Sequence, residues 1–291
     1  MIRLVAALVG LTFCAALLWG LVQPREAKPV DLVHKYYVEP EKVAFSFNNP
    51  FVGMYDRAQL QRGFQVYKEV CAGCHSLNRV AFRSLTEIGF SVPEVKAIAK
   101  GYDIPSLDAA GEPTTRKGLP SDNFYGPYAN DDAARAANNN ALPPDMSLLA
   151  KSRVGGPHYL HALLTGYRET APKDWAVPEG LWFNIHFHSL NIAMPPPLNP
   201  DQVTYADGTK ATVDQMAKDI AAFMMWAAEP KLEERRRTGV GAVIFLIILT
   251  GLAYLSYVRV WADLKAKKTV LPTGGPADPD ASQPTRAGGL S

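Results

Sequence analysis

Two uncharged apolar stretches frame this chain and leave a single segment between them to fold in water. The first, LVAALVGLTFCAALLWGLV, covers residues 4–22, and the second, TGVGAVIFLIILTGLAYLSYV, covers residues 238–258. A helix needs about 20 apolar residues to cross the hydrocarbon core of a bilayer. Residues 238–258 are therefore predicted to form a transmembrane helix. A buried core helix is the alternative, which their length and position make the weaker interpretation.

The N-terminal stretch is either a cleaved secretory signal or a retained anchor. The apolar core of a signal peptide is about 7–15 residues long and ends at a small-residue cleavage site. Residues 4–22 run longer, and no clear A-x-A motif follows them. We assign residues 1–25 to one of these two roles and favour retention. In both cases the rest of the chain is predicted to cross the membrane.

A C-x-x-C-H motif lies between the two stretches, in VCAGCHSL (70–77). Cys71 and Cys74 have the spacing with which two cysteines form thioether bonds to the vinyl groups of one haem. The next residue, His75, is then in place to bind the iron. An amphipathic helix predicted over residues 56–70 would hold the three groups on one side of the ring. We therefore predict one covalently attached haem c.

Composition weighs against the other uses of this motif. The chain has three cysteines, and Cys14 lies in the first apolar stretch, so a disulfide framework is excluded. A structural zinc site needs about four Cys or His ligands, usually from two paired clusters, and the second pair is missing. A thioredoxin-like dithiol belongs to a βαβ context, which the sequence lacks. The net charge is only +2, and no basic run is interleaved with aromatic residues, so the sequence does not indicate a nucleic-acid partner.

The charges that flank the second stretch leave its orientation ambiguous. Four basic residues follow it, as expected on the cytoplasmic side, but Arg235–Arg237 precede it. Because c-type haem is attached outside the cytoplasmic membrane in bacteria, the motif decides the orientation. The haem domain is predicted in the periplasm and the C-terminus in the cytoplasm. Residues 259–291 would form a cytoplasmic tail, largely disordered because Pro, Gly, Ala and Ser recur beyond residue 269.

Residues 31–229 are predicted to form one mainly α-helical domain with long loops. Thr212 and Gln215 have the spacing of a capping box, and Asp207-Gly208 predicts a small hairpin over residues 203–211. Residues 102–130 are expected to form a long irregular loop. The predicted helices cover residues 56–70, 93–100, 131–140, 157–165 and 212–228.

The sixth ligand of the iron must come from another part of the chain. A methionine gives the high potential that suits electron transfer. Met194, in NIAMPPPLNP, is the leading candidate because three prolines restrict the loop that carries it. Met146 and Met54 are weaker candidates, and Met216, Met224 and Met225 are expected to pack in the core. The rival histidines are His158, His161, His186 and His188.

Five stretches of the sequence resemble the cytochrome c1 family, in an α-proteobacterial form. They occur in the family's order, cover most of residues 45–260 and end in the C-terminal anchor. The run WAAEP before a span, with AMPPPL and ALPPD, is far more specific than the C-x-x-C-H motif. The five stretches are RGFQVYKEVCAGCHSL (62–77), AARAANNNALPPDMS (133–147), GGPHYLHALLTGY (155–167), AMPPPL (193–198) and YADGTKATVDQMAKDIAAFMMWAAEPKLEERRRTG (205–239).

The resemblance implies a class I cytochrome c-like domain. Cys71 and Cys74 would anchor the haem, and His75 and Met194 would be its axial ligands. It also implies that Arg116 pairs with a haem propionate, as a guanidinium fork suits a carboxylate. Asn138 and Pro144 would line the haem pocket. Asn140 departs from the family's usual glycine, so the turn there could differ.

The resemblance further implies the haem subunit of the respiratory quinol–cytochrome c oxidoreductase. One electron would come from a Rieske iron–sulfur protein and pass to a soluble or anchored cytochrome c. Cytochrome b and membrane lipid would be the neighbours of the anchor, in a dimeric complex. Two alternatives stay open, which are a stand-alone anchored cytochrome or oxidase subunit, and a haem sensor or peroxidase with an open sixth site.

Overall fold

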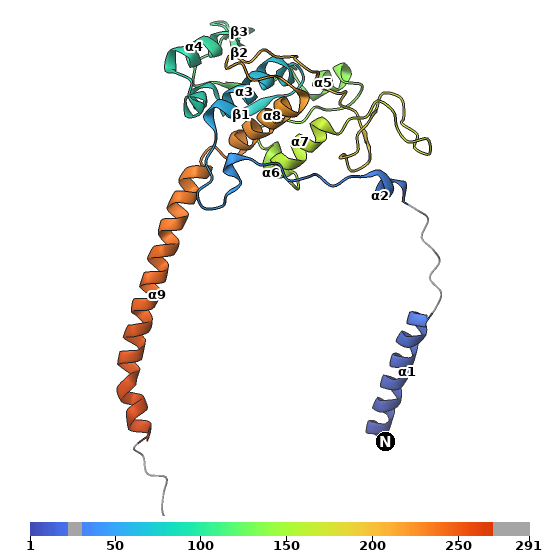
Figure 1. Ribbon diagram of the computed structural model, residues 1–291, viewed down its shortest axis with the longest axis vertical. Helices are drawn as coiled ribbons and strands as arrows, with labels where there is room; N and C mark the ends of the chain where they lie inside the picture. The colour runs from blue at the N-terminus through green and yellow to red at the C-terminus, as the bar shows by residue number, and fades with distance from the viewer. Residues whose placement is uncertain (23–30, 270–291) are drawn as a thin grey trace, which may run out of the picture. The chain divides into compact units, whose positions relative to one another are not determined.

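The computed structural model describes residues 1–22 and 31–269 (Figure 1). Residues 270–291, where the disordered part of the tail is predicted, lie outside the described residues, as do residues 23–25 of the predicted signal or anchor. The chain divides into two compact units. Of the described residues, one unit contains 1–22, 31–48 and 55–230, and the other contains 49–54 and 231–269.

Helices dominate the described residues, as predicted from the sequence. Short strands and three 3-10 turns fill parts of the long loops. The α-helices are α1 (Ile2–Val22), α2 (Leu32–Tyr36), α3 (Arg57–Glu69), α4 (Val92–Lys100), α5 (Asp131–Ala137), α6 (Leu149–Ser152), α7 (Pro157–Thr165), α8 (Val213–Ala228) and α9 (Leu232–Thr269). The 3-10 turns are Ser46–Asn48, Cys71–Gly73 and Phe82–Ile88.

Local signals start these helices close to the predicted residues, but α5 ends at Ala137, three residues before the predicted end at residue 140. Asp56 caps α3 by accepting hydrogen bonds from the amides of Ala58 and Gln59. Ser91 and Glu94 form a complete capping box at α4. The box predicted at α8 is half formed. Thr212 accepts from the Gln215 amide at 3.1 Å, but the Gln215 side chain donates to Asp219 at 2.9 Å instead of returning to Thr212.

The domain core forms where α3 packs against α8 (Figure 1). Helices α6 and α7 also pack against α8. Gly63 makes the close approach of α3 and α8 possible, because a Cβ at that position would lie 2.1 Å from the Asp219 carbonyl oxygen. Large aromatic side chains from several elements fill the space around this crossing. They include Phe64, Tyr67, Phe82, Phe124, Phe223 and Trp226, all buried.

A fully buried carboxylate ties the same two helices together. Asp219 on α8 is 0% exposed, and it accepts hydrogen bonds from Arg62 Nε at 3.0 Å and from the Gln59 side chain at 3.3 Å. Arg62 also pairs with Asp207 at 2.8 Å. A buried charge is tolerated when it is paired and hydrogen-bonded in this way. The network therefore fixes the rotation of α3, the helix that leads into the C-x-x-C-H motif.

The predicted hairpin at residues 203–211 is wrong. The Asp207-Gly208 turn forms, with Gly208 at a φ of 76°, but its flanks do not pair as strands. They lie against α3 instead, since the Thr204 carbonyl accepts from Gln65 at 2.9 Å and Asp207 accepts from Arg62. Side chains of α3 satisfy the polar groups that a hairpin ladder would have used.

Strands occur in the segment that the sequence predicts as an irregular loop. β2 (Asp103–Leu107) and β3 (Pro113–Lys117) form an antiparallel hairpin, pairing Asp103 with Lys117 and Leu107 with Pro113. β3 is exposed along its whole length, and β2 alternates only between exposed and half-buried residues. Neither strand therefore has the fully buried face that makes a strand easy to predict from its sequence. Two smaller pairs join β1 (Leu77–Ala81) to β4 (Asn123–Phe124) and β5 (Trp182–Phe183) to β6 (Asn191–Ile192).

Two helices are long and apolar enough to cross a membrane. They are Ile2–Val22, which is α1, and Leu232–Ala262 within α9. The predicted span at residues 238–258 lies inside α9, and the helix is continuous on both sides of it. The window of high hydropathy in each helix is 0% buried. A core helix of a water-soluble domain would bury such a surface.

Candidate haem site

The C-x-x-C-H motif directly follows the C-terminal end of α3. Cys71–Gly73 form one 3-10 turn, in which the amides of Cys74 and His75 donate to the Cys71 carbonyl at 3.1 and 2.9 Å. Residues three apart eclipse one another in a 3-10 turn, so the backbone carries Cys71 and Cys74 on the same side. This is the arrangement that two thioether bonds to one porphyrin edge require.

His75 makes a hydrogen bond through one ring nitrogen, and this bond leaves the lone pair of the other nitrogen available to a metal. Its Nδ1 lies 2.8 Å from the Pro144 carbonyl oxygen. Because a carbonyl only accepts, Nδ1 must carry the proton, and the lone pair is then on Nε2. Burial lowers the pKa of His75, which favours the neutral imidazole. Metal-binding histidines characteristically make this kind of bond with their second nitrogen, so the residues present fit a haem iron.

The loop that carries Pro144 is clamped onto the motif by an aspartate that the sequence analysis missed. Asp145 accepts hydrogen bonds from the Ser76 hydroxyl at 2.7 Å and from the Asn78 amide at 2.8 Å. The Met146 amide adds a third link by donating to the Ser76 carbonyl at 2.9 Å. Asp145 stands in ALPPD, a run noticed only as part of the resemblance. It positions the Pro144 carbonyl that orients His75.

The environment of Cys71 argues against the other chemistries of a cysteine pair. Desolvation raises the pKa of the Cys71 thiol to about 12, which disfavours the thiolate that attacks disulfides. Among the residues that the structure describes, no group of three or more Cys, His, Asp or Glu side chains is placed to hold a metal ion.

Met194 lies two residues after β6, in the loop with three prolines, and is half-buried. The Tyr167 hydroxyl donates to the Met194 carbonyl oxygen at 3.0 Å, and this bond holds the loop to the chain segment after α7. The Asn191 side chain, just before it, accepts from the Trp175 indole at 3.0 Å. Restricted backbone and a fixed carbonyl are what a weak thioether ligand needs. The assignment of Met194 to the iron stays a prediction.

Three of the other methionines are used in packing. Met146 is 4% exposed, and Met216 and Met224 are similarly buried in the core. Met225, which was also predicted to pack in the core, is only half-buried. Met54 is exposed and belongs to the other compact unit. These environments favour Met194 over Met146 and Met54 as the source of the thioether.

The rival histidines hold other parts of the chain together. His158 Nδ1 accepts from the Val43 amide at 3.0 Å, and His186 Nδ1 lies 2.7 Å from the Val38 carbonyl. His161 Nε2 lies 2.9 Å from the Asp214 carboxylate. These three rings have structural partners within the domain, and His188 is exposed. Each of these bonds engages one ring nitrogen, as the bond of His75 to Pro144 does, so they do not decide between a histidine and Met194, and the sixth ligand stays a prediction.

Arg116 does not have the environment that the resemblance implies. It lies on β3, and its guanidinium forks onto Asp122, with Nη1 at 2.6 Å and Nη2 at 2.8 Å from the two carboxylate oxygens. Hydrogen bonding to Arg116 lowers the pKa of Asp122 to about 2. The fork that a propionate would need is thus occupied by a side chain of the same loop, and the contacts do not support the propionate role.

A substitution at Arg116 distinguishes pairing with Asp122 from pairing with a haem propionate. We expect Arg116→Gln to leave the reduction potential of the haem unchanged, because the charge removed belongs to an exposed pair with Asp122. A redox titration of the variant beside the native chain checks this. A marked fall in potential would instead restore Arg116 as a propionate partner, since loss of a positive charge beside the haem disfavours reduction.

Asn138 ends α5 and shapes the loop that leads to Pro144. Its side-chain amide donates to the Ala134 carbonyl at 2.7 Å and to the Tyr128 hydroxyl at 2.9 Å. The next two residues, Asn139 and Asn140, have φ values of 50° and 61°. Asparagine tolerates this left-handed region better than most residues. The departure at Asn140 therefore keeps a backbone conformation that a glycine would also adopt.

The hydrogen bond on Met194 can be tested at the tyrosine. Tyr167→Phe removes a part-buried bond, which costs about 1 kcal/mol, and should lower the temperature at which methionine coordination is lost. The oxidised protein's weak red charge-transfer band, which marks methionine bound to haem iron, is the measurement. Tyr125→Phe, at an exposed tyrosine, is the control. Equal loss temperatures in both variants would show that the Tyr167 bond does not hold the ligand loop.

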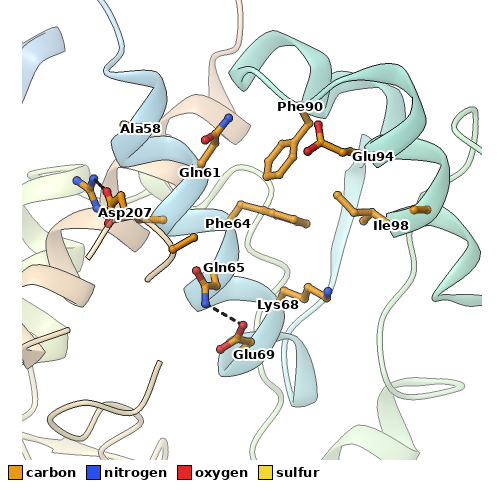
Figure 2. Close-up of a pocket in the computed structure, with 13 residues that line it drawn as sticks. Ala58, Gln61, Phe64, Gln65, Lys68, Glu69, Phe90, Glu94, Ile98 and Asp207 are labelled. Carbon is orange, nitrogen blue, oxygen red and sulfur yellow. Dashed lines mark hydrogen bonds and ion pairs between the residues drawn. The ribbon is translucent and has the colours of Figure 1, made fainter. Parts of the chain in front are cut away.

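A hollow of about 510 Å³ lies on another flank of α3. Figure 2 shows Phe64 and Phe90 at its apolar floor, with Lys68, Glu69 and Glu94 among the polar groups around it. None of the predicted haem residues lines it. The hollow is therefore separate from the candidate haem site.

A mainly α-helical domain with a C-x-x-C-H turn at the end of its first core helix defines a cytochrome c-like protein. The model of the cytochrome c1 family matches residues 45–264. The chain belongs to the cytochrome c1 family, whose members are haem proteins of respiratory electron transport.

Similar proteins occur in bacteria and in mitochondria. The chain is 45% identical over 229 residues to "Cytochrome c1" of Rhodospirillum rubrum, covering 73% of this chain and 84% of that protein. It is 46% identical over 228 residues to "Cytochrome c1, heme protein, mitochondrial" of Saccharomyces cerevisiae, with coverages of 78% and 74%. A third relative, "Cytochrome b/c1" of Bradyrhizobium diazoefficiens, is 44% identical over 247 residues, which are 77% of this chain and 36% of that longer protein.

Proposed function

We propose that this chain is the electron-transfer subunit of a quinol–cytochrome c oxidoreductase. It accepts one electron from a Rieske iron–sulfur protein and passes it to a soluble or anchored cytochrome c. Membership of the family supports the complex, and the geometry of His75 is the observation that supports the site. The reductase activity belongs to the complex, since this chain alone makes and breaks no bonds.

One covalent haem c is the proposed cofactor, and it supplies a one-electron redox couple. Cys71 and Cys74 would form its thioether bonds, and His75 Nε2 and the Met194 thioether would bind its iron. Pro144 holds the His75 proton on Nδ1 through the 2.8 Å bond, which keeps the imidazole in one orientation. Asn138 acts at a distance, by fixing the loop that presents Pro144.

Methionine and a neutral imidazole would favour the reduced form of a bound haem, because neither ligand brings a negative charge to it. Such a site would have a high potential, which suits the last step before a cytochrome c. The chain's own contribution is to hold both ligand residues in place, His75 through Pro144 and the Met194 loop through Tyr167.

The proposed setting is a bacterial inner membrane, with the haem domain in the periplasm and the C-terminus in the cytoplasm. The apolar segment of α9 is the anchor, and cytochrome b is its proposed neighbour in a dimeric complex. The Bradyrhizobium relative supports this neighbour, because its name joins cytochrome b and c1 in one protein. Residues 1–25 act as a signal or as a second anchor.

Purification through a tag on this chain, in mild detergent, tests the proposal. We expect b-type haem to co-purify with the c-type haem, and quinol-dependent reduction of added cytochrome c by the preparation. The c-type haem should titrate as a single one-electron couple. A preparation with c-type haem alone, and without quinol oxidation, would favour the stand-alone carrier and contradict the assignment to the complex.

A further inference from the structure

The loop before α3 exposes an unusual set of apolar side chains. Between Asn49 and Met54, Phe51 is 72% exposed, Val52 is 74% exposed and Met54 is 63% exposed. Single exposed apolar residues are common on protein surfaces, but adjacent ones mark a contact with something apolar. We name residues 49–54 the interfacial loop.

Three amides of the interfacial loop are bonded within it. The amides of Phe51 and Val52 donate to the Asn49 side-chain oxygen at 2.9 and 3.1 Å, and the Gly53 amide donates to the Asn49 carbonyl at 3.1 Å. The loop is therefore a compact turn closed by Asn49, with Phe51, Val52 and Met54 exposed. Amides that are bonded in this way lower the cost of entering a water-poor environment.

The interfacial loop is joined to the start of α9. Arg236 Nη1 donates to the Gly53 carbonyl oxygen at 3.0 Å, and loop and helix form one compact unit. Arg236 is the middle one of three consecutive arginines that directly precede the uncharged run 238–258. Basic side chains at the end of a spanning helix lie at the level of the lipid headgroups. The hydrogen bond thus brings Gly53 to the level of the membrane surface.

We propose that the interfacial loop inserts Phe51, Val52 and Met54 into the boundary between headgroups and acyl chains, in the leaflet where α9 enters the bilayer. The occupant of this apolar surface is lipid. The inference rests on the proposed anchoring by α9 and goes beyond it, because it gives the chain a second point of contact with the membrane beside α9.

Spin labels on the full chain, purified in its complex and placed in lipid nanodiscs, test the inference. Cys14→Ala provides the background, so that only an introduced cysteine is labelled while Cys71 and Cys74 are held in thioether bonds. Val52→Cys carries the label in the loop. Leu107→Cys, on β2 and 66% exposed, is the matched control in water, and Phe245→Cys on α9 is the control in lipid.

The measurement is the collision of each label with oxygen, which concentrates in lipid, and with a water-soluble nickel chelate. We expect the ratio of oxygen to nickel collisions at residue 52 to approach that at residue 245 and to exceed that at residue 107 several-fold. A ratio at residue 52 equal to that at residue 107 would overturn the inference. A label at residue 52 shielded from both reagents would also overturn it, because the loop would then lie against protein.

The lipid control separates this inference from the proposed anchor. If residue 245 reports lipid and residue 52 reports water, the anchor stands and the interfacial loop fails. If residue 245 itself reports water, α9 is not the anchor and both proposals fail.

Discussion

Replacing both cysteines of the motif, Cys71→Ser with Cys74→Ser, is expected to abolish covalent haem attachment to this chain. Serine has nearly the same volume but cannot form the thioether. The 3-10 turn of Cys71–Gly73 should still form, since its hydrogen bonds come from the backbone. Haem staining after denaturing electrophoresis measures the result, and the stained band should disappear completely.

Two controls make this first test specific. Cys14→Ser changes the third cysteine, which lies in α1, and should leave the stain intact. Either single replacement in the motif leaves one thioether, so the stain should persist in weaker form. A stained band of native strength in the double variant would contradict the attachment site.

Gly63→Ala is expected to have the largest effect on folding among single substitutions in the core. The added methyl would lie 2.1 Å from the Asp219 carbonyl oxygen and 2.7 Å from the Phe223 Cβ. Overpacking typically costs about 1–3 kcal/mol, and here we expect the upper end or more because the opposing atoms belong to the rigid backbone of α8. Relief requires α3 to move away from α8, which also breaks the bonds of Arg62 and Gln59 to Asp219.

The yield of haem-loaded protein and its thermal unfolding temperature measure this second effect. Gly73→Ala is the matched control, since a Cβ at Gly73 meets no atom within 4 Å. It also lies in the motif itself, so it tests whether any added methyl near the haem is harmful. Equal yields and unfolding temperatures for Gly63→Ala and Gly73→Ala would contradict the close packing of α3 and α8.

The sequence predicted those features whose cause is local. α7 has the predicted bounds because Pro157 suits a first turn and Gly166 follows the last helical residue. The amphipathic pattern and Asp56 predicted α3, and the length of the uncharged run predicted the long apolar helix. The spacing of the C-x-x-C-H motif likewise depends on neighbouring residues only.

The features that the sequence missed depend on contacts between distant segments. The hairpin predicted at residues 203–211 failed because Gln65 and Arg62 of α3 bond to that segment. Asp145 was missed as the residue that clamps the Pro144 loop to Ser76, because its partner is far away in the chain. The bond of Arg116 to Asp122 was missed because nothing local shows that the turn brings the two side chains together, and the propionate role of Arg116 stays a prediction. β2 and β3 were missed because neither has a buried face.

If His75 and Met194 together bind the haem iron, the absorption spectrum of the oxidised protein should show it most directly. The spectra to compare are those of the native chain, Met194→Leu and Met146→Leu. The red charge-transfer band of methionine-bound iron is expected in the native chain and in Met146→Leu, because Met146 packs in the core. In Met194→Leu the band should be absent and the reduction potential lower. A band that survives in Met194→Leu, or that disappears in Met146→Leu, would contradict the account.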